Sequence, residues 1–403
     1  MRFFRDWSVS AFSAGFVAVL VGFTSSIAIV FQAALAFGAT PAVMASWMWA
    51  IGLGMGLCTL VPSLWLRKPV MIAWSTPGAA VLASAGLAGG YSMHDAVGAF
   101  MLCAVLTVLV GATGWFERLM DRIPVAIASA LLAGVLARFG LSAFTAAQTN
   151  LPLVLLMLLT YLAGKRFLPR YAVPLTLLLA VGYVALTHGF VATDIQFGLT
   201  TPVWVSPSFS FPAFVSLALP LFIVTMASQN LPGVAAIRAA GFGDQRASGG
   251  DAGIPISATI TLSGLCTLLL APFGAFALNL SAITAAICMG PEAHADPARR
   301  YTAAVSCGGI YVLVGLFGAT IIGVLTAFPK ELVAAIAGLA LLGSIAGGLR
   351  VALDKEQDRE AAIITFLVCL SGVTLAGVGS AFWGVVAGAL ALAVQHWHKP
   401  QTI

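Results

Sequence analysis

The chain has 403 residues, of which 60% are hydrophobic and only 8% are charged, whereas soluble domains carry about 25% charged residues. This composition excludes a soluble globular protein. The net charge of +5 comes from loop lysines and arginines and does not indicate nucleic-acid binding. The six cysteines lie in apolar runs without metal-ligand spacing, so we expect no metal and no cofactor. No catalytic constellation or phosphate loop is present, so we do not expect an enzyme.

Uncharged runs follow one another along the chain, and a membrane span needs about 20 apolar residues. The first run is too long for the core of a signal peptide. We place fourteen spans at residues 9–36, 41–66, 70–89, 96–116, 122–140, 148–165, 171–188, 211–238, 252–271, 275–290, 300–326, 329–349, 361–376 and 379–396. The sequence therefore predicts an all-α polytopic membrane protein in a lipid bilayer.

Fourteen spans put both termini on the same side of the membrane. All 19 Lys and Arg except Arg138 and Lys330 fall on that side. By the positive-inside rule it is the cytoplasmic side of a bacterial-type inner membrane. A twelve-span count that ignores the two short spans keeps much of this bias, so charge alone leaves the count open.

The third span carries a helix-start signal in its middle. Ser75, Thr76, Pro77 and Gly78 follow the bulky, extended-looking residues 70–74, and proline behind serine or threonine is typical of a first helical turn. We expect a half-helix that begins inside the membrane near Pro77, where free N–H groups and the helix dipole favour an anion. A proline kink in a continuous helix is the plainer alternative.

An internal repeat supports the broken helix. When the second half is moved back by 204 residues, Asn279 falls on Ser75, Ser281 on Pro77, and residues 228–230 on residues 24–26. Seven spans per unit is an odd number, so the second unit enters the membrane from the opposite face. We therefore expect a 7+7 inverted repeat, with spans 3 and 10 both broken.

The repeat also divides the chain and predicts how the broken spans meet. Residues 1–188 form the first unit, 189–210 a periplasmic linker and 211–403 the second unit. Short extended pieces near 70–74 and 274–278 are expected to pair antiparallel, because backbone at membrane depth must be hydrogen-bonded. The second half-helix is expected to begin near Ser281, with Asn279 and Ser281 as its caps.

Polar and aromatic residues near the middle of spans 1, 3, 8 and 10 are the candidate substrate site. The predicted contacts are Thr24, Ser25, Trp74, Ser75, Thr76, Gly78, Ser228, Gln229, Asn230, Phe276, Asn279 and Ser281. Interhelical hydrogen bonding, bonding back to the helix, capping and plain packing are the competing explanations. Pro232 and Gly233, residue types that disfavour helix, follow the polar triplet of span 8 closely, which favours the site interpretation of residues 228–230.

Candidate proton carriers follow the two broken spans. They are His94, Asp95, Glu292 and His294, since histidine titrates near neutral pH. These residues also fit the description of solvated loop residues. The proton could instead travel on the substrate or through backbone and water, and the sequence leaves this open.

Three stretches of the chain, residues 68–79, 219–233 and 279–290, resemble the benzoate:proton symporter family (BenE). The 7+7 repeat with broken spans resembles the fold of uracil permease and the sulfate permeases. Uracil-type permeases carry an acidic residue in span 8 where this chain has Ser228 and Gln229, and an uncharged site suits an anionic substrate.

The resemblance implies import of benzoate or a similar aromatic carboxylate with protons across the inner membrane. It also implies a substrate-binding core of spans 1–4 and 8–11 and a gate, or scaffold, of spans 5–7 and 12–14. Assembly into a homodimer is compatible with the sequence but is not decided by it. A permease of the same fold for another small anion or a nucleobase-like ring is the alternative.

Overall fold

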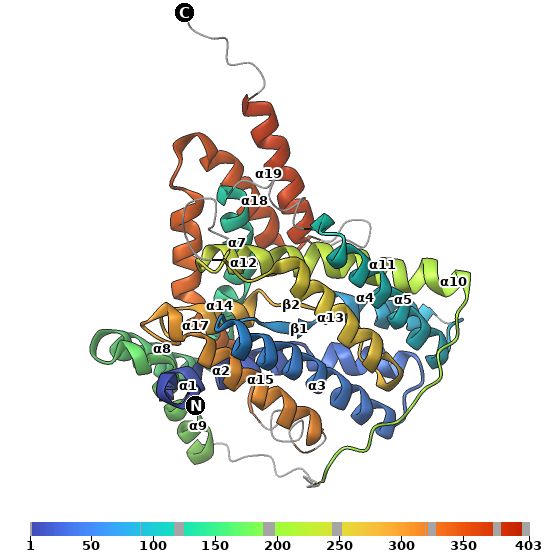
Figure 1. Ribbon diagram of the computed structural model, residues 1–403. Helices are drawn as coiled ribbons and strands as arrows, with labels where there is room; N and C mark the ends of the chain where they lie inside the picture. The colour runs from blue at the N-terminus through green and yellow to red at the C-terminus, as the bar shows by residue number, and fades with distance from the viewer. Residues whose placement is uncertain are drawn as a thin grey trace, which may run out of the picture.

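The computed structural model describes residues 2–88, 90–116, 125–187, 198–243, 252–318, 320, 328–373 and 380–396. In the first half it contains α1 (Arg2–Asp6), α2 (Val9–Ala36), α3 (Pro41–Leu66), β1 (Ile72–Trp74), α4 (Thr76–Ala88), α5 (Met93–Ala112), α7 (Val125–Thr145), α8 (Leu151–Phe167) and α9 (Ala172–Thr187). The two strands β1 and β2 lie at the centre, with helices on both sides of them (Figure 1).

The second half begins with a long helical stretch made of α10 (Phe211–Ala213), η3 (Phe214–Ala218), α11 (Leu219–Thr225), η4 (Met226–Asn230) and α12 (Leu231–Ala239). It continues with α13 (Ile256–Leu270), β2 (Leu278–Leu280), α14 (Ile283–Met289), α15 (Tyr301–Leu316), α17 (Lys330–Ala352), α18 (Arg359–Ser371) and α19 (Ser380–His396). The predicted helical membrane architecture is therefore present.

Several helices begin where the sequence supplies a cap. Ser8 and Thr40 accept hydrogen bonds from backbone N–H groups of the first turns of α2 and α3. Ser92 and Asp95 form a reciprocal capping box at the start of α5. Such caps pair N–H groups that have no partner within the helix.

Five helical stretches in the described part of the chain are long and apolar enough to cross a membrane. They are Pro41–Leu66, Met93–Ala112, Val125–Gln148, Ile256–Phe273 and Ala334–Ala352. Shorter apolar helices, among them Ala172–Thr187 and Phe211–Thr225, accompany them. Length and composition therefore identify a membrane protein.

The helical stretch 211–239 is continuous, as expected for span 8, and passes through Pro232 and Gly233 without a break. It contains two π-helical segments, η3 and η4, and each directly precedes a Leu-Pro pair, Leu219-Pro220 and Leu231-Pro232. Proline has no N–H and its ring displaces the carbonyl four residues before it. A locally wider turn accommodates both effects without ending the helix.

The helices pack in two groups. The first comprises α2 to α5 and the helices between residues 211 and 316, with α3 against α15 and α5 against α13 as major contacts. In the second, α7 packs against α17, α18 and α19, and α8 packs against α9 and α17. Contacts between the groups run mainly through α2, α12 and α14.

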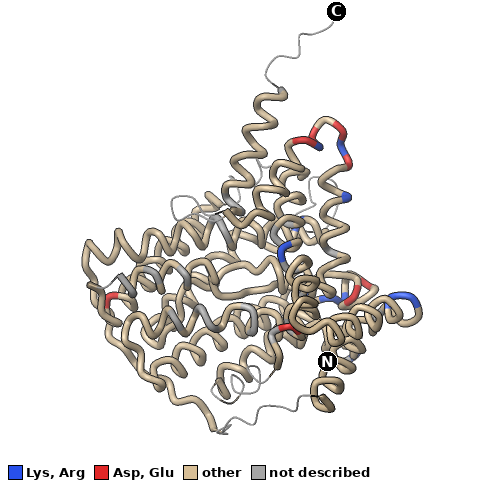
Figure 2. Tube along the Cα trace, turned by 180° about the vertical axis from the view of Figure 1, so that it is seen from behind, with Lys and Arg blue, Asp and Glu red and all other residues tan. Residues whose placement is uncertain are grey.

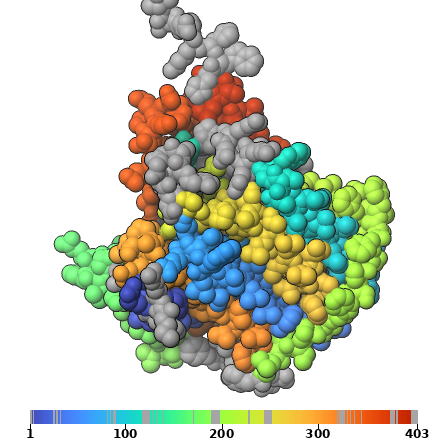
Figure 3. All heavy atoms as spheres, in the orientation of Figure 1, coloured from blue at the N-terminus to red at the C-terminus, as the bar shows by residue number. Residues whose placement is uncertain are grey.

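Residues 198–210 form a strap along the edge of the first group. Figure 3 shows it as part of a yellow-green band at the margin of the molecule. Its backbone bonds to Leu316, to Ser46, to Pro272 and to His94, so it ties together α15, α3, the turn after α13 and the start of α5. Residues 189–197 of the predicted linker lie outside the described residues.

The charged residues gather at one end of the helices. Figure 2 shows nearly all the described Lys, Arg, Asp and Glu on that side, away from the strap. This distribution agrees with the predicted charge bias, because charged side chains are excluded from the apolar middle of a membrane protein.

Candidate functional site

The candidate site is built on a two-stranded ribbon at the centre of the first helix group. β1 and β2 pair antiparallel, with Ala73 opposite Asn279. Two further backbone bonds extend the ribbon, from Ser75 N to Ala277 O at 3.1 Å and from Ser281 N to Met71 O at 3.0 Å. The ribbon thus joins the entrances of α4 and α14.

The second strand lies later in the chain than the sequence indicated. It covers Leu278–Leu280 rather than residues 274–278, because the chain turns first: Gly274 has φ 105° and Ala277 has φ 38°. A side chain at Gly274 would collide with the indole of Trp47. These turns place Asn279 in the middle of the ribbon.

Hydroxyl groups from two helices supply acceptors at the ribbon's edges. Thr59 of α3 accepts from Ile72 N at 3.0 Å, and Thr267 of α13 accepts from Leu278 N at 3.1 Å. Ser63 bonds both the N–H and the carbonyl of Val70. None of these three residues was predicted from the sequence, although hydroxyl groups in otherwise apolar helices were a usable signal.

Asn230, the last residue of η4, completes the edge of β2. Its side-chain oxygen accepts from Leu280 N at 2.9 Å, and its amide donates to the sulfur of Met226. Gly233, one turn later, allows this close approach: a Cβ there would lie 2.6 Å from the Cβ of Leu280. Asn230 is therefore primarily a support of the ribbon.

The two half-helices begin at positions slightly different from those expected. α4 starts at Thr76 rather than Pro77, and Ser75 caps it by accepting from Gly78 N at 3.0 Å. α14 starts at Ile283 rather than Ser281 and has only seven residues. Because Ser75 uses the Gly78 N–H, that donor is already occupied.

Asn279 and Ser281 do not cap α14, contrary to the sequence-based prediction. Ala282 holds the cap position and provides no side-chain bond. Asn279 lies in β2, and the Ser281 hydroxyl accepts from the Thr284 hydroxyl at 2.7 Å. The strand extends further along the chain than predicted, which moves both residues out of the cap and onto the ribbon.

One face of the ribbon carries its polar side chains. Side chains alternate between the faces of a strand, so Ser75, Asn279 and Ser281 share the face of Ala73. The other face carries Ile72, Trp74, Leu278 and Leu280, all buried. Ala73 is partly exposed while Asn279 is fully buried beside it, so the polar face borders accessible space.

Trp74 lies on the apolar face. Its indole N–H donates to Ser26 Oγ at 3.0 Å, and its ring meets Phe23 edge to face at 4.8 Å. Phe276 is fully buried between Trp47 and Phe100, with centroid distances of 5.8 and 6.0 Å. Both aromatic residues have packing partners, and their contact with a substrate stays a prediction.

The remaining substrate candidates are only partly described. Thr76 and Gln229 are half-buried, and Gly78 packs closely against Leu221 of α11. The side chains of Thr24, Ser25 and Ser228 lie outside the described residues.

The candidate proton carriers after the first broken span anchor the strap. His94 donates through Nδ1 to Ser206 O at 2.7 Å. Asp95 accepts from the hydroxyl of Ser208 at 2.9 Å while it caps α5. These bonds give both residues a structural role, and proton coupling through them stays a prediction.

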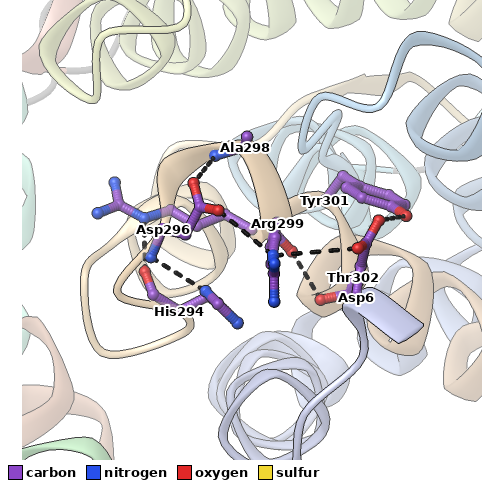
Figure 4. A network of polar contacts seen from close by, with 8 residues as sticks. Asp6, His294, Asp296, Ala298, Arg299, Tyr301 and Thr302 are labelled. Atoms are coloured by element: carbon purple, nitrogen blue, oxygen red, sulfur yellow. Dashed lines mark hydrogen bonds and ion pairs between the residues drawn. The ribbon is translucent and has the colours of Figure 1, made fainter. Parts of the chain in front are cut away.

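The candidates after α14 lie in a network of polar contacts. Figure 4 shows His294 and Asp296 in the turn before α15, with Arg299 between Asp296 and Asp6 of α1. His294 Nδ1 accepts from Asp296 N at 3.0 Å. Arg300 donates to the carbonyls of His294 and Met289, and the second bond satisfies the end of α14.

Glu292 joins the two helix groups. Its carboxylate pairs with Lys165 of α8 at 2.5 Å and lies against Gly343 of α17. It also lines a small cavity between α2, α9, α14 and α17, together with Ser10, Val173 and Ile287. Glu292 is therefore an interface residue between groups.

Apolar helices of membrane-spanning length around a buried ribbon, with charged residues at one end, define a polytopic membrane protein. The pattern of the benzoate membrane transport protein family (BenE) matches residues 5–394, and the chain belongs to this family. It is 47% identical over 381 residues to "Inner membrane protein YdcO" of Escherichia coli K12, covering 94% of each chain. It is 38% identical over 387 residues to "Benzoate membrane transport protein" of Acinetobacter baylyi, covering 96% of this chain and 95% of the relative.

Solved structures show the same fold at low identity. The chain resembles SLC26A9 with a TM-score of 0.54 and 12% identity, covering 98% of this chain and 67% of that one. Murine Slc26a9, an anion transporter solved in the inward-facing state, matches with a TM-score of 0.50 and 12% identity. The match covers 96% of this chain and 68% of that one. The family is one of membrane transport proteins rather than enzymes, and murine Slc26a9 is likewise a transporter.

Proposed function

We propose that this protein imports benzoate or a similar aromatic carboxylate, together with protons, across the inner membrane. Membership of the benzoate membrane transport family carries this proposal, supported by 38% identity to a relative named for benzoate transport. The uncharged ribbon at the centre agrees with it, since Asp and Glu are absent from residues 7–94 and 252–291, which contain its two strands.

We further propose fourteen spans in a 7+7 inverted repeat, with both termini cytoplasmic. The packing supports this because contacts occur in repeat-related pairs. α3 packs on α15 as α13 packs on α5, and α2 packs on α17 as α12 packs on α7. The pairs α8 with α9 and α18 with α19 correspond in the same way.

The two helix groups are proposed to act as core and gate. The ribbon, α4 and α14 belong to the first group, and the cavity lined by Glu292 lies where α2 and α14 meet α9 and α17. A substrate held at the ribbon would reach one side of the membrane when the groups shift against each other. The substrate contacts are proposed to come from the polar face of the ribbon, Thr76 and Gln229, with the other sequence candidates around them.

Uptake of labelled benzoate into proteoliposomes tests the function. An inward proton gradient should produce accumulation that a protonophore abolishes. Protein-free liposomes measure passive leakage, and exchange of internal for external benzoate without a gradient reports the carrier itself. If the folded protein does not exchange internal for external benzoate, benzoate is not its substrate. Accumulation of benzoate that survives the protonophore would refute proton coupling.

A further inference from the structure

The polar face of the ribbon holds a buried acceptor without a donor among the described residues. Asn279 is 0% exposed, and its side-chain oxygen Oδ1 has no hydrogen-bond partner there. Its amide donates to Ala277 O at 3.0 Å, which fixes the orientation of the side chain and leaves the oxygen as the unpaired atom. A buried acceptor without a donor costs free energy, so such an atom needs an explanation.

The same face offers hydroxyl donors. Ser75 Oγ accepts from Gly78 N at 3.0 Å and from Thr225 Oγ1 at 2.9 Å. Both lone pairs of this oxygen are then used, so only its hydrogen remains available. Ser281 Oγ accepts from Thr284 and likewise retains its own hydrogen.

Charges that could stabilise an anion are absent from the elements that pack against the ribbon. α2, α3, α13 and η4 contain no Asp, Glu, Lys, Arg or His, and their titratable side chains are Cys58 and Cys266. Burying a carboxylate without a cation is costly, and burial favours the protonated form of a carboxylic acid. A site with only hydrogen-bond donors would suit an anion. This face also contains Asn279 Oδ1, an acceptor without a donor among the described residues, which suits a ligand that carries a donor of its own.

We propose that the ribbon binds the aromatic acid in its neutral, protonated form, so that the coupling proton travels on the substrate. The acid O–H donates to Asn279 Oδ1, and the acid carbonyl accepts from the hydroxyl of Ser75 or Ser281. The carboxylate takes one proton from water on the outer side, and the O–H bond breaks again in the cytoplasm. This inference rests on the proposed function and requires no titratable protein group at the site.

Ligands that differ only in their polar group test the inference on the full-length protein in detergent. Benzoate, benzamide and benzenesulfonate are titrated at two pH values, with binding followed by calorimetry. The sulfonate stays anionic, whereas the amide is neutral and has both a donor and an acceptor. The apparent Kd of benzoate should rise by about tenfold per pH unit, in step with the falling fraction of neutral acid. The Kd of benzamide should stay constant, and benzenesulfonate should not compete.

Asn279→Leu provides a second measurement, because it removes the acceptor from the site. Benzoate and benzamide should both weaken by about tenfold or more, since both lose the same buried partner. A pH-independent benzoate Kd with competition by benzenesulfonate would overturn the neutral-acid inference and leave benzoate transport standing. Failure of wild-type protein to bind benzoate at either pH would instead overturn the proposed function.

Discussion

Asn230 accepts a hydrogen bond from the backbone of Leu280 at 2.9 Å, so a side chain of η4 completes the edge of β2. Both residues are buried, and the bond joins the long helix 211–239 to the broken span. A strand edge at membrane depth has no water to bond, so this acceptor must come from the protein.

Asn230→Leu should therefore destabilise the fold. The substitution leaves the Leu280 N–H without its acceptor and should lower the free energy of unfolding by about 1–3 kcal/mol. Thermal unfolding in detergent measures the change. An unaltered melting temperature would show that the bond contributes nothing net.

The threonines of α3 and α13 should behave alike. Thr59→Val and Thr267→Val keep the side-chain shape but remove the acceptors of Ile72 N and Leu278 N. Each should cost about 1–3 kcal/mol of unfolding free energy. Thr187→Val is the matched control, because that exposed hydroxyl bonds only within its own helix. Equal melting temperatures for all three variants would contradict the assigned role.

Gly233→Ala should be poorly tolerated. The new Cβ would lie 2.6 Å from the Cβ of Leu280 and 3.0 Å from its carbonyl oxygen, so helix and ribbon must separate, at a cost of about 1–3 kcal/mol. Gly182→Ala in α9 meets no atom within 4 Å and should be neutral or stabilising. Comparison of unfolding midpoints tests the pair, and similar values for both variants would refute the close contact.

Glu292→Gln should preserve proton-coupled uptake. The pair with Lys165 is partly exposed, at 32% and 20% of the two side chains, so its loss should cost only about 0–1 kcal/mol. If the proton travels on the substrate, accumulation of benzoate should remain sensitive to the protonophore. Exchange without accumulation would instead identify Glu292 as the proton carrier.

Exchanging the charges of Lys165 and Glu292 tests whether their ion pair links the two helix groups, and so serves as the control for Glu292→Gln. Lys165→Glu combined with Glu292→Lys restores the attraction between α8 and the loop after α14, and should transport better than either single variant. A double variant that is no better than the singles would show that the pair does not link the helix groups.

The sequence alone was sufficient to predict a helical membrane protein, because membrane burial imposes a strong local signal. Uncharged runs of span length, and the Ser75-Thr76-Pro77 helix start, predicted α2, α3 and the entrance of α4 to within a few residues. The start of α14 was less accurate, because the turns at Gly274 and Ala277 depend on contacts with Trp47 and the first strand.

Roles within the site depended on the tertiary structure. From the sequence, Asn230 and Asn279 were equivalent candidate substrate residues. Only the packing of η4 against β2 assigned the Asn230 oxygen to Leu280, and among the described residues the Asn279 oxygen has no partner. Composition and hydropathy are properties of single segments and fix which segments enter the membrane. Hydrogen-bond partners are properties of two distant segments, so only the assembled fold decided which polar groups remain available for a ligand.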